Sequence, residues 1–308
     1  MSKVMKKDLL LCLFLLVGIS TSAQTEWETK IIEVNGVPYA LSPIKGGTFT
    51  MGADKNAKDD TGKYLYEMAT KIRVPNEVPA RQVTLSDFWM GQTEVTRALW
   101  QAVMGKNYDK SYFTKSLQIP VHNVSWEQAK EFCKRLSKII GETVRLPTEA
   151  EWEYVYRGGS NQEIANGGNI GWNDSNSNNV LHEVAQKKPN KFLVYDMSGN
   201  VWEWCEDCFQ EKYHPKSPVT NPVDYRTSER IVTSESNWDR VVRGSNYMTP
   251  YISHTDYFRS TLRYHFAPDD YDRQFGFRIV IPSKEMEQKM TVFKTVRQQQ
   301  KRGTPAKK

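Results

Sequence analysis

The segment Tyr195-Asp-Met-Ser-Gly-Asn-Val-Trp-Glu-Trp204 carries the strongest structural information in the chain. Gly199 and Asn200 both tolerate a positive φ, so together they predict a tight turn. In an extended strand after that turn, both tryptophans would point to one side and Glu203 to the other, because side chains alternate along a strand. The acids on either side of the turn, with its exposed carbonyls, are the hard oxygen ligands that Ca²⁺ prefers.

The spacing leaves two interpretations of this segment open. In the first, the tryptophans pin a turn, and Asp196 and Glu203 are solvated surface acids. In the second, the two carboxylates and the carbonyls between them bind Ca²⁺. Only the second interpretation predicts that removing an acid weakens calcium binding.

The composition is that of a globular protein. The chain has 308 residues, 39% of them hydrophobic and 12% aromatic, which is enough for one large domain or two small ones. The formal charge of +6 resides in residues 284–308, where eight Lys or Arg stand against two Glu. The remaining chain is near neutral, which argues against a nucleic-acid-binding domain.

The N-terminus has the pattern of an export signal. Lys3, Lys6 and Lys7 precede an apolar run, Leu9–Val17, that is too short to span a bilayer. Thr21-Ser-Ala23 provides a small-residue cleavage site, although an uncleaved anchor is the alternative. We therefore expect a signal peptide over residues 1–23, a short lead-in over 24–36, a domain over 37–283 and a basic tail over 284–308.

The exported chain would contain three cysteines, in a compartment where disulfides can form. Cys205 and Cys208 could form a small disulfide, and Cys133 is most simply a buried thiol on a helix. A zinc site would require two more ligands than the Cys-x-x-Cys pair supplies. The odd count leaves at least one thiol unpaired in a monomer, and the sequence does not assign the pairing.

Capping residues predict three helices. Thr96 is the expected N-cap of a short helix that ends before Gly105. Capping boxes at Ser125–Gln128 and Thr148–Glu151 start two more. The first of these has an apolar face that consists of Trp126, Ala129, Phe132, Cys133, Leu136 and Ile140. Strands are expected at 47–52, within 81–95, and at 240–244 and 275–280, whereas 159–195 and 205–238 read as long loops.

Five groups of residues then follow a known family in order. They are Phe88-Trp-Met-Gly-Gln-Thr-Glu-Val-Thr96; Pro120-Val-His-Asn-Val-Ser-Trp126; Arg145-Leu-Pro-Thr-Glu-Ala-Glu-Trp-Glu-Tyr154; Pro189-Asn190 with Tyr195 to Trp204; and Arg243-Gly244 with Gly276-Phe-Arg278. Over roughly residues 37–282, the chain resembles the formylglycine-generating enzyme (sulfatase-modifying factor) family. The resemblance implies an α+β fold with modest regular structure, related to C-type lectins.

The resemblance also implies bound calcium. Carried over from the family, the ligands are the side chain of Asp196, the carbonyls of Gly199 and Val201, and the side chain of Glu203. A second calcium is implied in the Asn-rich loop, near Asn178 or Asn179, without a defined ligand set. Leu193 stands where the family has Gly just before the segment, so the local loop geometry is expected to differ.

The chemistry of the family is not implied with the fold. Formylglycine-generating enzymes oxidise a substrate cysteine to an aldehyde with O₂, using two copper-binding cysteines, and soft thiolates suit Cu(I). Here Thr249 and His254 occupy those positions, and no cysteine follows Cys208. We therefore expect neither copper nor iron. An iron site drawn from His254, Asp256 and His265 has suitable residue types but matches no motif of the iron-containing relatives.

Two classes of function follow. The first is a non-catalytic, calcium-stabilised binding or scaffold protein of the cell envelope, periplasmic or envelope-associated, with a protein or glycan partner. The alternative is an oxidoreductase of the formylglycine-generating or non-haem iron type that acts on a thiol substrate with O₂. Calcium alone would favour the first class, and stoichiometric copper or iron the second.

Two further segments bear on partners. In residues 284–308, Met286, Met290 and Phe293 recur at helical spacing among basic residues. This tail is either solvated or a salt-sensitive contact with the anionic envelope. The aromatic group Tyr247, Tyr251, Tyr257 and Phe258 is expected to pack in the core rather than line a pocket.

Overall fold

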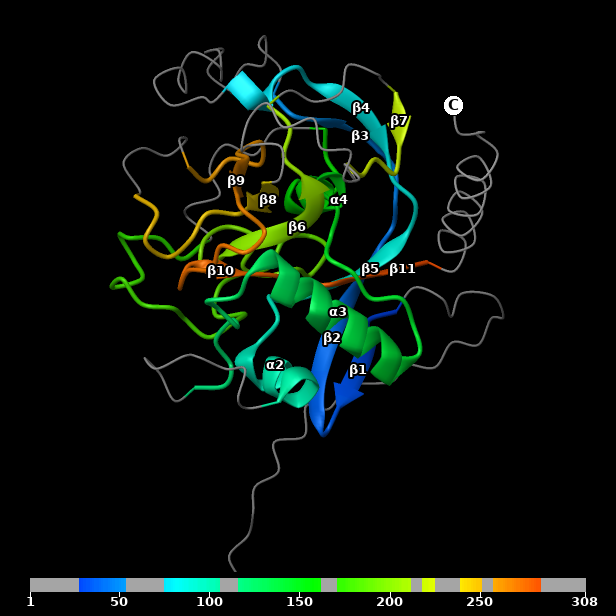
Figure 1. Cartoon of the computed structure of the whole chain (residues 1–308). Coiled ribbons are helices and arrows are strands. Elements are labelled where there is room, and N and C mark those ends of the chain that lie inside the picture. Colours follow the sequence, from blue (N-terminus) through cyan, green and yellow to red (C-terminus); the bar gives the residue numbers. More distant parts are fainter. Residues whose placement is uncertain are drawn as a thin grey trace, which may run out of the picture.

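Three small sheets, three α-helices and one 3₁₀ turn form the part of the chain that the structure describes (Figure 1). The computed structural model describes residues 28–53, 75–105, 116–161, 171–211, 218–224, 239–250 and 257–283. The strands are β1 (Lys30–Val34), β2 (Val37–Ile44), β3 (Thr48–Met51), β4 (Arg81–Thr84), β5 (Phe88–Gly91), β6 (Trp202–Cys208), β7 (Val219–Thr220), β8 (Arg240–Arg243), β9 (Tyr264–Phe266), β10 (Phe275–Gly276) and β11 (Val280–Pro282). The helices are α2 (Arg97–Met104), α3 (Trp126–Ile140), α4 (Glu149–Tyr156) and a 3₁₀ turn, η1 (Pro75–Glu77).

The first sheet joins the two ends of the domain. Its order is β1-β2-β5-β11, and every pair is antiparallel. Asn35 and Gly36, both at positive φ, form the tight turn between β1 and β2. Part of the predicted lead-in over 24–36 is therefore a strand of this sheet. At the other end, β11 lies beside β5 with Val280 opposite Met90, so the last described strand is inside the fold.

The second sheet contains the 195–204 segment. Its order is β10-β6-β8-β9, with β10 parallel to β6 and the other pairs antiparallel. All seven residues of β6 are buried, up to and including Cys208. The surface loop predicted over 205–238 is therefore wrong at its start, because Cys205–Cys208 continue the central strand. The third sheet, β3-β4-β7, lies at the edge of the molecule (Figure 1).

The predicted helix starts are confirmed. Thr96 accepts a hydrogen bond from Leu99 N at the start of α2. Ser125 and Thr148 each form a complete capping box, at the starts of α3 and α4. Within the described ranges, no helix is both long and apolar enough to cross a membrane.

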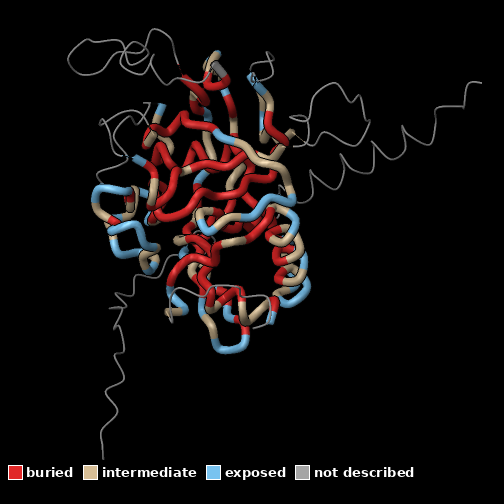
Figure 2. Tube along the Cα trace, turned by 60° about the vertical axis from the view of Figure 1, so that its left-hand side comes forward, coloured by how far each residue is buried: buried red, intermediate tan, exposed pale blue. Residues whose placement is uncertain are grey.

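Two apolar cores flank β6. The first collects the inner faces of α2 and α3 with Trp204 and Phe277, and the second packs α4 against β3, β4 and Cys205. Figure 2 shows the buried chain as a continuous inner region within an exposed rim. As predicted, both tryptophans of β6 face the first core. Glu203, between them, lies on the opposite side of the strand.

Candidate functional site

The turn of the 195–204 segment is held by backbone contacts on both sides. Gly199 has φ +88°, and a Cβ at this position would overlap the carbonyl oxygen of Trp172. Its N–H donates to Gly244 O at 2.7 Å, and Asn200 N donates to Trp172 O at 3.1 Å. Glycine is therefore required here both by conformation and by the close approach of a neighbouring chain.

The Glu203 carboxylate is part of a buried ion pair. Arg278 Nε and Nη2 donate to its two oxygens, each at 2.6 Å, and Trp152 Nε1 donates to Oε2 at 2.9 Å. The side chains of Glu203 and Arg278 have no exposed surface. The interpretation of this acid as solvated is therefore wrong. Both of its oxygens accept charge-assisted hydrogen bonds from a planar fork.

Arg278 connects three segments that are distant in sequence. Besides Glu203, its guanidinium donates to Gly91 O at 3.1 Å and to Tyr195 O at 3.0 Å. The N–H of Tyr195 in turn donates to Gln92 O at 2.7 Å. The end of β5 and the start of the 195–204 segment are thereby fixed side by side.

Two further carboxylates lie at this junction, on Glu94 and Asp196. Glu94 is fully buried, and neither of its carboxylate oxygens has a hydrogen-bond partner among the described residues. Asp196 is 5% exposed; its Oδ2 accepts from Ala185 N at 2.7 Å, whereas Oδ1 has no partner in the described part of the chain. Burial, and then repulsion by Asp196, raises the pKa of Glu94 well above its usual range. Burial likewise raises the pKa of Asp196 to about 6.

The implied calcium ligands fit a cation only in part. The unpartnered Oδ1 of Asp196 is a suitable hard oxygen ligand, and Asp196 and Glu203 do lie in one region, as predicted. Glu203, however, is already paired with Arg278 and Trp152. No group of three or more His, Cys, Asp or Glu side chains within the described ranges is arranged as a metal site. Any cation here would need backbone carbonyls or water to complete its ligands.

The α4 carboxylates form a second buried charge network, which sequence reasoning missed. Glu149 is paired with Arg263 through two hydrogen bonds of 2.6 and 2.8 Å. Glu153 accepts from Arg157 at 2.6 Å and from Arg243 at 2.5 Å. The helix dipole favours acids in the first turn of a helix, but it does not indicate that they are buried and paired. The alternation of Glu with aromatic residues in this helix was the available signal, since acids within an apolar run require buried partners.

Thr249, at the first catalytic-cysteine position of the resembled family, has a structural role. It is 7% exposed, and its hydroxyl accepts a hydrogen bond from Asn246 N at 3.0 Å. Its own N–H donates to Asn246 O at 3.0 Å, so Thr249 closes a short turn after β8. His254, at the second position, and Asp256 lie outside the described residues. His265 is paired with Asp239, and its ring stacks on Phe209 with the centroids 3.9 Å apart.

Cys133, Cys205 and Cys208 are buried, and none of them forms a disulfide with another described residue. Cys205 and Cys208 do not form the small disulfide that was considered. Burial raises the pKa of the Cys133 thiol to about 12 and that of Cys205 well above its usual range. Thiols in this state are poor nucleophiles and poor metal ligands, because both roles require the thiolate.

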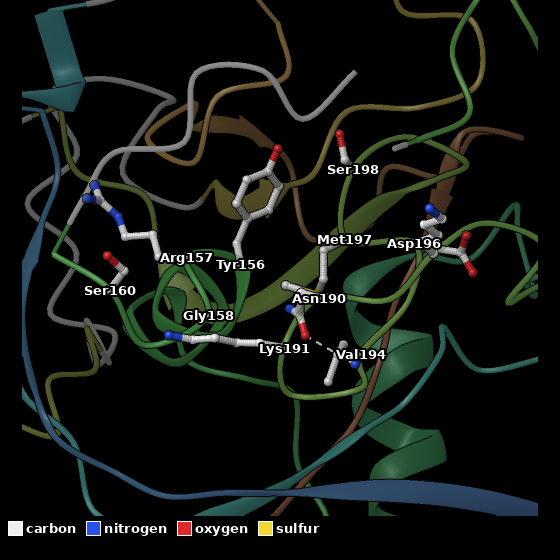
Figure 3. A pocket seen from close by; sticks show the side chains of 11 residues that line it. Tyr156, Arg157, Gly158, Ser160, Asn190, Lys191, Val194, Asp196, Met197 and Ser198 are labelled. Carbon is white, nitrogen blue, oxygen red and sulfur yellow. Dashed lines mark hydrogen bonds between the residues drawn. The ribbon is translucent and has the colours of Figure 1, made fainter. Parts of the chain in front are cut away.

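A pocket of about 420 Å³ opens beside the 195–204 segment (Figure 3). Its walls come from the end of α4, from the loop over residues 188–194 and from residues 196–198. Lys188 and Lys191 at its margin are exposed, whereas Tyr156 and Met197 are buried. In Figure 3 the carboxylate of Asp196 points away from Tyr156 and from the other side chains of the pocket. Asp196 therefore contributes to the wall of the pocket without directing its carboxylate toward Tyr156.

Other predicted positions have separate locations. Asn178 and Asn179 both adopt the left-handed conformation, at φ 55° and 57°. Leu193, which stands where the resembled family has Gly, has a positive φ of 58°. The expected aromatic core is confirmed for Tyr247 and Phe258, which are both buried. Tyr251 and the 284–308 tail lie outside the described residues.

Comparison with known proteins identifies the family to which the domain is similar. The model of the sulfatase-modifying factor enzyme 1-like domain matches residues 38–283. The mouse formylglycine-generating enzyme is 26% identical over 318 residues, which span 78% of this chain and 75% of the mouse protein. The inactive C-alpha-formylglycine-generating enzyme 2 of Bos taurus is 29% identical over 213 residues, or 63% of this chain and 68% of that protein. Among solved structures, Treponema denticola variable protein 1 superposes with a TM-score of 0.65 at 26% identity, covering 83% of this chain and 99% of its own.

Proposed function

Because the chain belongs to the sulfatase-modifying factor enzyme 1-like family, we propose that it is an exported, non-catalytic binding or scaffold protein of the cell envelope, stabilised by calcium. Its fold is the C-type-lectin-like fold of that family, as the resemblance implied. This architecture serves unrelated functions, so the fold alone does not assign an activity. The residues of the site carry the argument.

One observation supports the absence of catalysis. Thr249 stands at the first copper-thiolate position, and its hydroxyl is engaged in its own turn. No cysteine follows Cys208 in the chain, and Cys133, Cys205 and Cys208 are all buried. An inactive relative from Bos taurus shows that a protein of similar sequence can lack the activity.

The pocket beside the 195–204 segment is our candidate for the binding surface. Lys188 and Lys191 give its margin a positive charge, and Tyr156 and Met197 provide apolar surface. Pockets of this size and mixed lining are typical of sites for one small group. An acidic sugar or an acidic side chain of an envelope partner matches this chemistry.

The activity test uses a peptide with the sequence Cys-x-Pro-x-Arg, copper and a reductant. We expect no loss of thiol mass from the peptide, while an active formylglycine-generating enzyme assayed in parallel forms the aldehyde. Metal analysis of the purified protein should give calcium without stoichiometric copper or iron. Aldehyde formed well above the protein-free control, or stoichiometric iron or copper, would instead support the oxidoreductase alternative.

A further inference from the structure

The loop over residues 187–194 exposes a leucine in an unfavourable backbone conformation. Leu193 has a positive φ of 58°, and the residue is 55% exposed. The left-handed conformation is unfavourable for a residue with a Cβ, whereas Gly adopts it freely. A leucine with this exposure recovers little of that cost through burial in its own core. Backbone strain that packing does not explain is typical of functional positions.

Hydrogen bonds hold the loop in this conformation. Asn190 Oδ1 accepts from Phe192 N at 2.9 Å and from Val194 N at 3.2 Å. Leu193 N donates to Asn190 O at 3.0 Å, and Leu193 O accepts from Ser42 Oγ at 3.3 Å. The leucine is therefore presented on a preformed surface, which lowers the entropic cost of binding a partner.

Ile31, which is 68% exposed, lies on the same side of the first sheet. In the register of β1 and β2, Ile31 is opposite Ala40, and Ala40 and Ser42 share one face of β2 because side chains alternate along a strand. The hydrogen bond from Ser42 to Leu193 O places the loop at that face. The other face of the two strands packs with α3 in the first core (Figure 1). The two exposed aliphatic side chains thus belong to one surface.

Two lysines give the same loop a positive charge. Lys188 and Lys191 are exposed at the margin of the pocket beside the 195–204 segment. The side chain of Lys191 runs past Gly158 at the end of α4, where a Cβ would lie 3.0 Å from Lys191 Cγ (Figure 3). Asp196 is the one carboxylate among the described residues that line the pocket, and it is only 5% exposed. The exposed charge of this surface is therefore complementary to an acidic ligand.

These observations favour an acidic polypeptide over other anionic ligands. A sugar acid would pair with the lysines but would place its hydroxyl groups against Leu193 and Ile31, where they lose hydrogen bonds to water. A membrane surface is flat, whereas the pocket beside Lys191 is a recess of about 420 Å³. A polypeptide carries carboxylates and apolar side chains on one chain, so it can match both the lysines and the aliphatic residues.

We propose that Lys188, Lys191, Leu193 and Ile31 form a docking surface for an acidic, apolar segment of a partner protein. The carboxylates of that segment contact the two lysines, and its apolar side chains pack on the leucine and the isoleucine. This inference rests on the proposed binding function, and it narrows the ligand from acidic groups in general to a polypeptide.

The test selects peptides from a random library displayed on phage, with the purified protein immobilised. We expect the enriched peptides to combine Asp or Glu with Leu, Ile or Phe. Fluorescence anisotropy with synthetic copies should show an affinity about 10-fold weaker for Leu193→Asn, which loses apolar contact, and about 10-fold weaker for the double variant Lys188→Gln/Lys191→Gln. Leu193→Asn should keep the wild-type melting temperature, because Asn tolerates a positive φ.

The matched control is Ile139→Asn near the end of α3. Ile139 is 51% exposed, and α3 packs on the other face of the first sheet, so this variant should bind the peptides with wild-type affinity. Should Leu193→Asn melt far below the wild type, the double lysine variant and Ile31→Ser decide the question, because those three side chains are exposed.

The outcomes separate the inference from the proposed function. Enriched peptides without acidic residues, or equal affinities for the wild type and the surface variants, would overturn the inference. Binding of glucuronate without enrichment of any peptide would overturn it too, while the proposed binding function stands. Binding of phosphatidylglycerol vesicles alone would instead identify a membrane-binding surface and overturn the polypeptide partner. If peptides, glucuronate and vesicles all fail to bind, the inference and the proposed binding function are both overturned.

Discussion

Replacing Arg278 with Lys should destabilise the protein strongly while conserving its charge. The guanidinium makes two hydrogen bonds to Glu203 and one each to Gly91 O and Tyr195 O. The lysine ammonium lacks the planar, five-donor geometry of the guanidinium, so it can retain the pair with Glu203 but not both carbonyl bonds in the same geometry. Each buried acceptor left without its donor costs about 1–3 kcal/mol, so we expect a loss of roughly 3 kcal/mol in the free energy of unfolding.

A domain of this size loses about 2–4 °C of melting temperature per kcal/mol, which gives a decrease of roughly 6–12 °C for Arg278→Lys. Differential scanning calorimetry measures this decrease. The matched control is Arg135→Lys on α3, where the arginine is 38% exposed and pairs with Glu131 one turn away. Its effect should stay within about 0.5 kcal/mol. Equal melting temperatures for the two variants would refute the role assigned to the buried guanidinium of Arg278.

Three further predictions concern other parts of the chain. Burial raises the pKa of Asp207 to about 7, above its unfolded value of ~4, so its contribution to stability is present below about pH 4 and is lost as the pH rises through 7. Asp207→Asn should flatten that part of the curve of unfolding free energy against pH, measured by urea unfolding. An unchanged slope would contradict this prediction. Gly199→Ala should abolish folding or cost several kcal/mol, because its Cβ meets the Trp172 carbonyl, whereas Gly36→Ala, with open space around its Cβ, should cost only about 1 kcal/mol by circular-dichroism melts. Changing the basic residues of the 284–308 tail to Gln should remove salt-sensitive sedimentation with anionic liposomes, because each charge contributes about 1 kcal/mol of binding free energy. If the variant sediments as much as the wild type, the tail does not bind the liposomes.

Local sequence rules predicted the helices well. The N-caps at Thr96, Ser125 and Thr148 were read from residue type and spacing alone, and each is formed as expected. These contacts span three residues, so no tertiary information is needed to identify them. The turn at Gly199 was predictable for the same reason.

The charge network was not predictable in this way. Arg278 and Glu203 are 75 residues apart, and Arg263 and Glu149 are 114 apart. Spacing cannot reveal such pairs, so the sequence analysis assigned the acids of the 195–204 segment either to solvent or to calcium. The family resemblance placed the segments correctly but could not indicate that Arg278 would occupy Glu203. It also did not mark Glu94, which lies in a different motif.

The buried thiols make the opening of each core measurable. Cys133 belongs to the first core and Cys205 to the second, so each is shielded by a different set of packed side chains. A thiol reagent can modify either one only after the surrounding core has opened, and the rate of labelling then measures the free energy of that opening. Equal labelling rates at Cys133 and Cys205 would mean that the two cores open to water together. Different rates would divide the domain into two cooperative units that meet along β6.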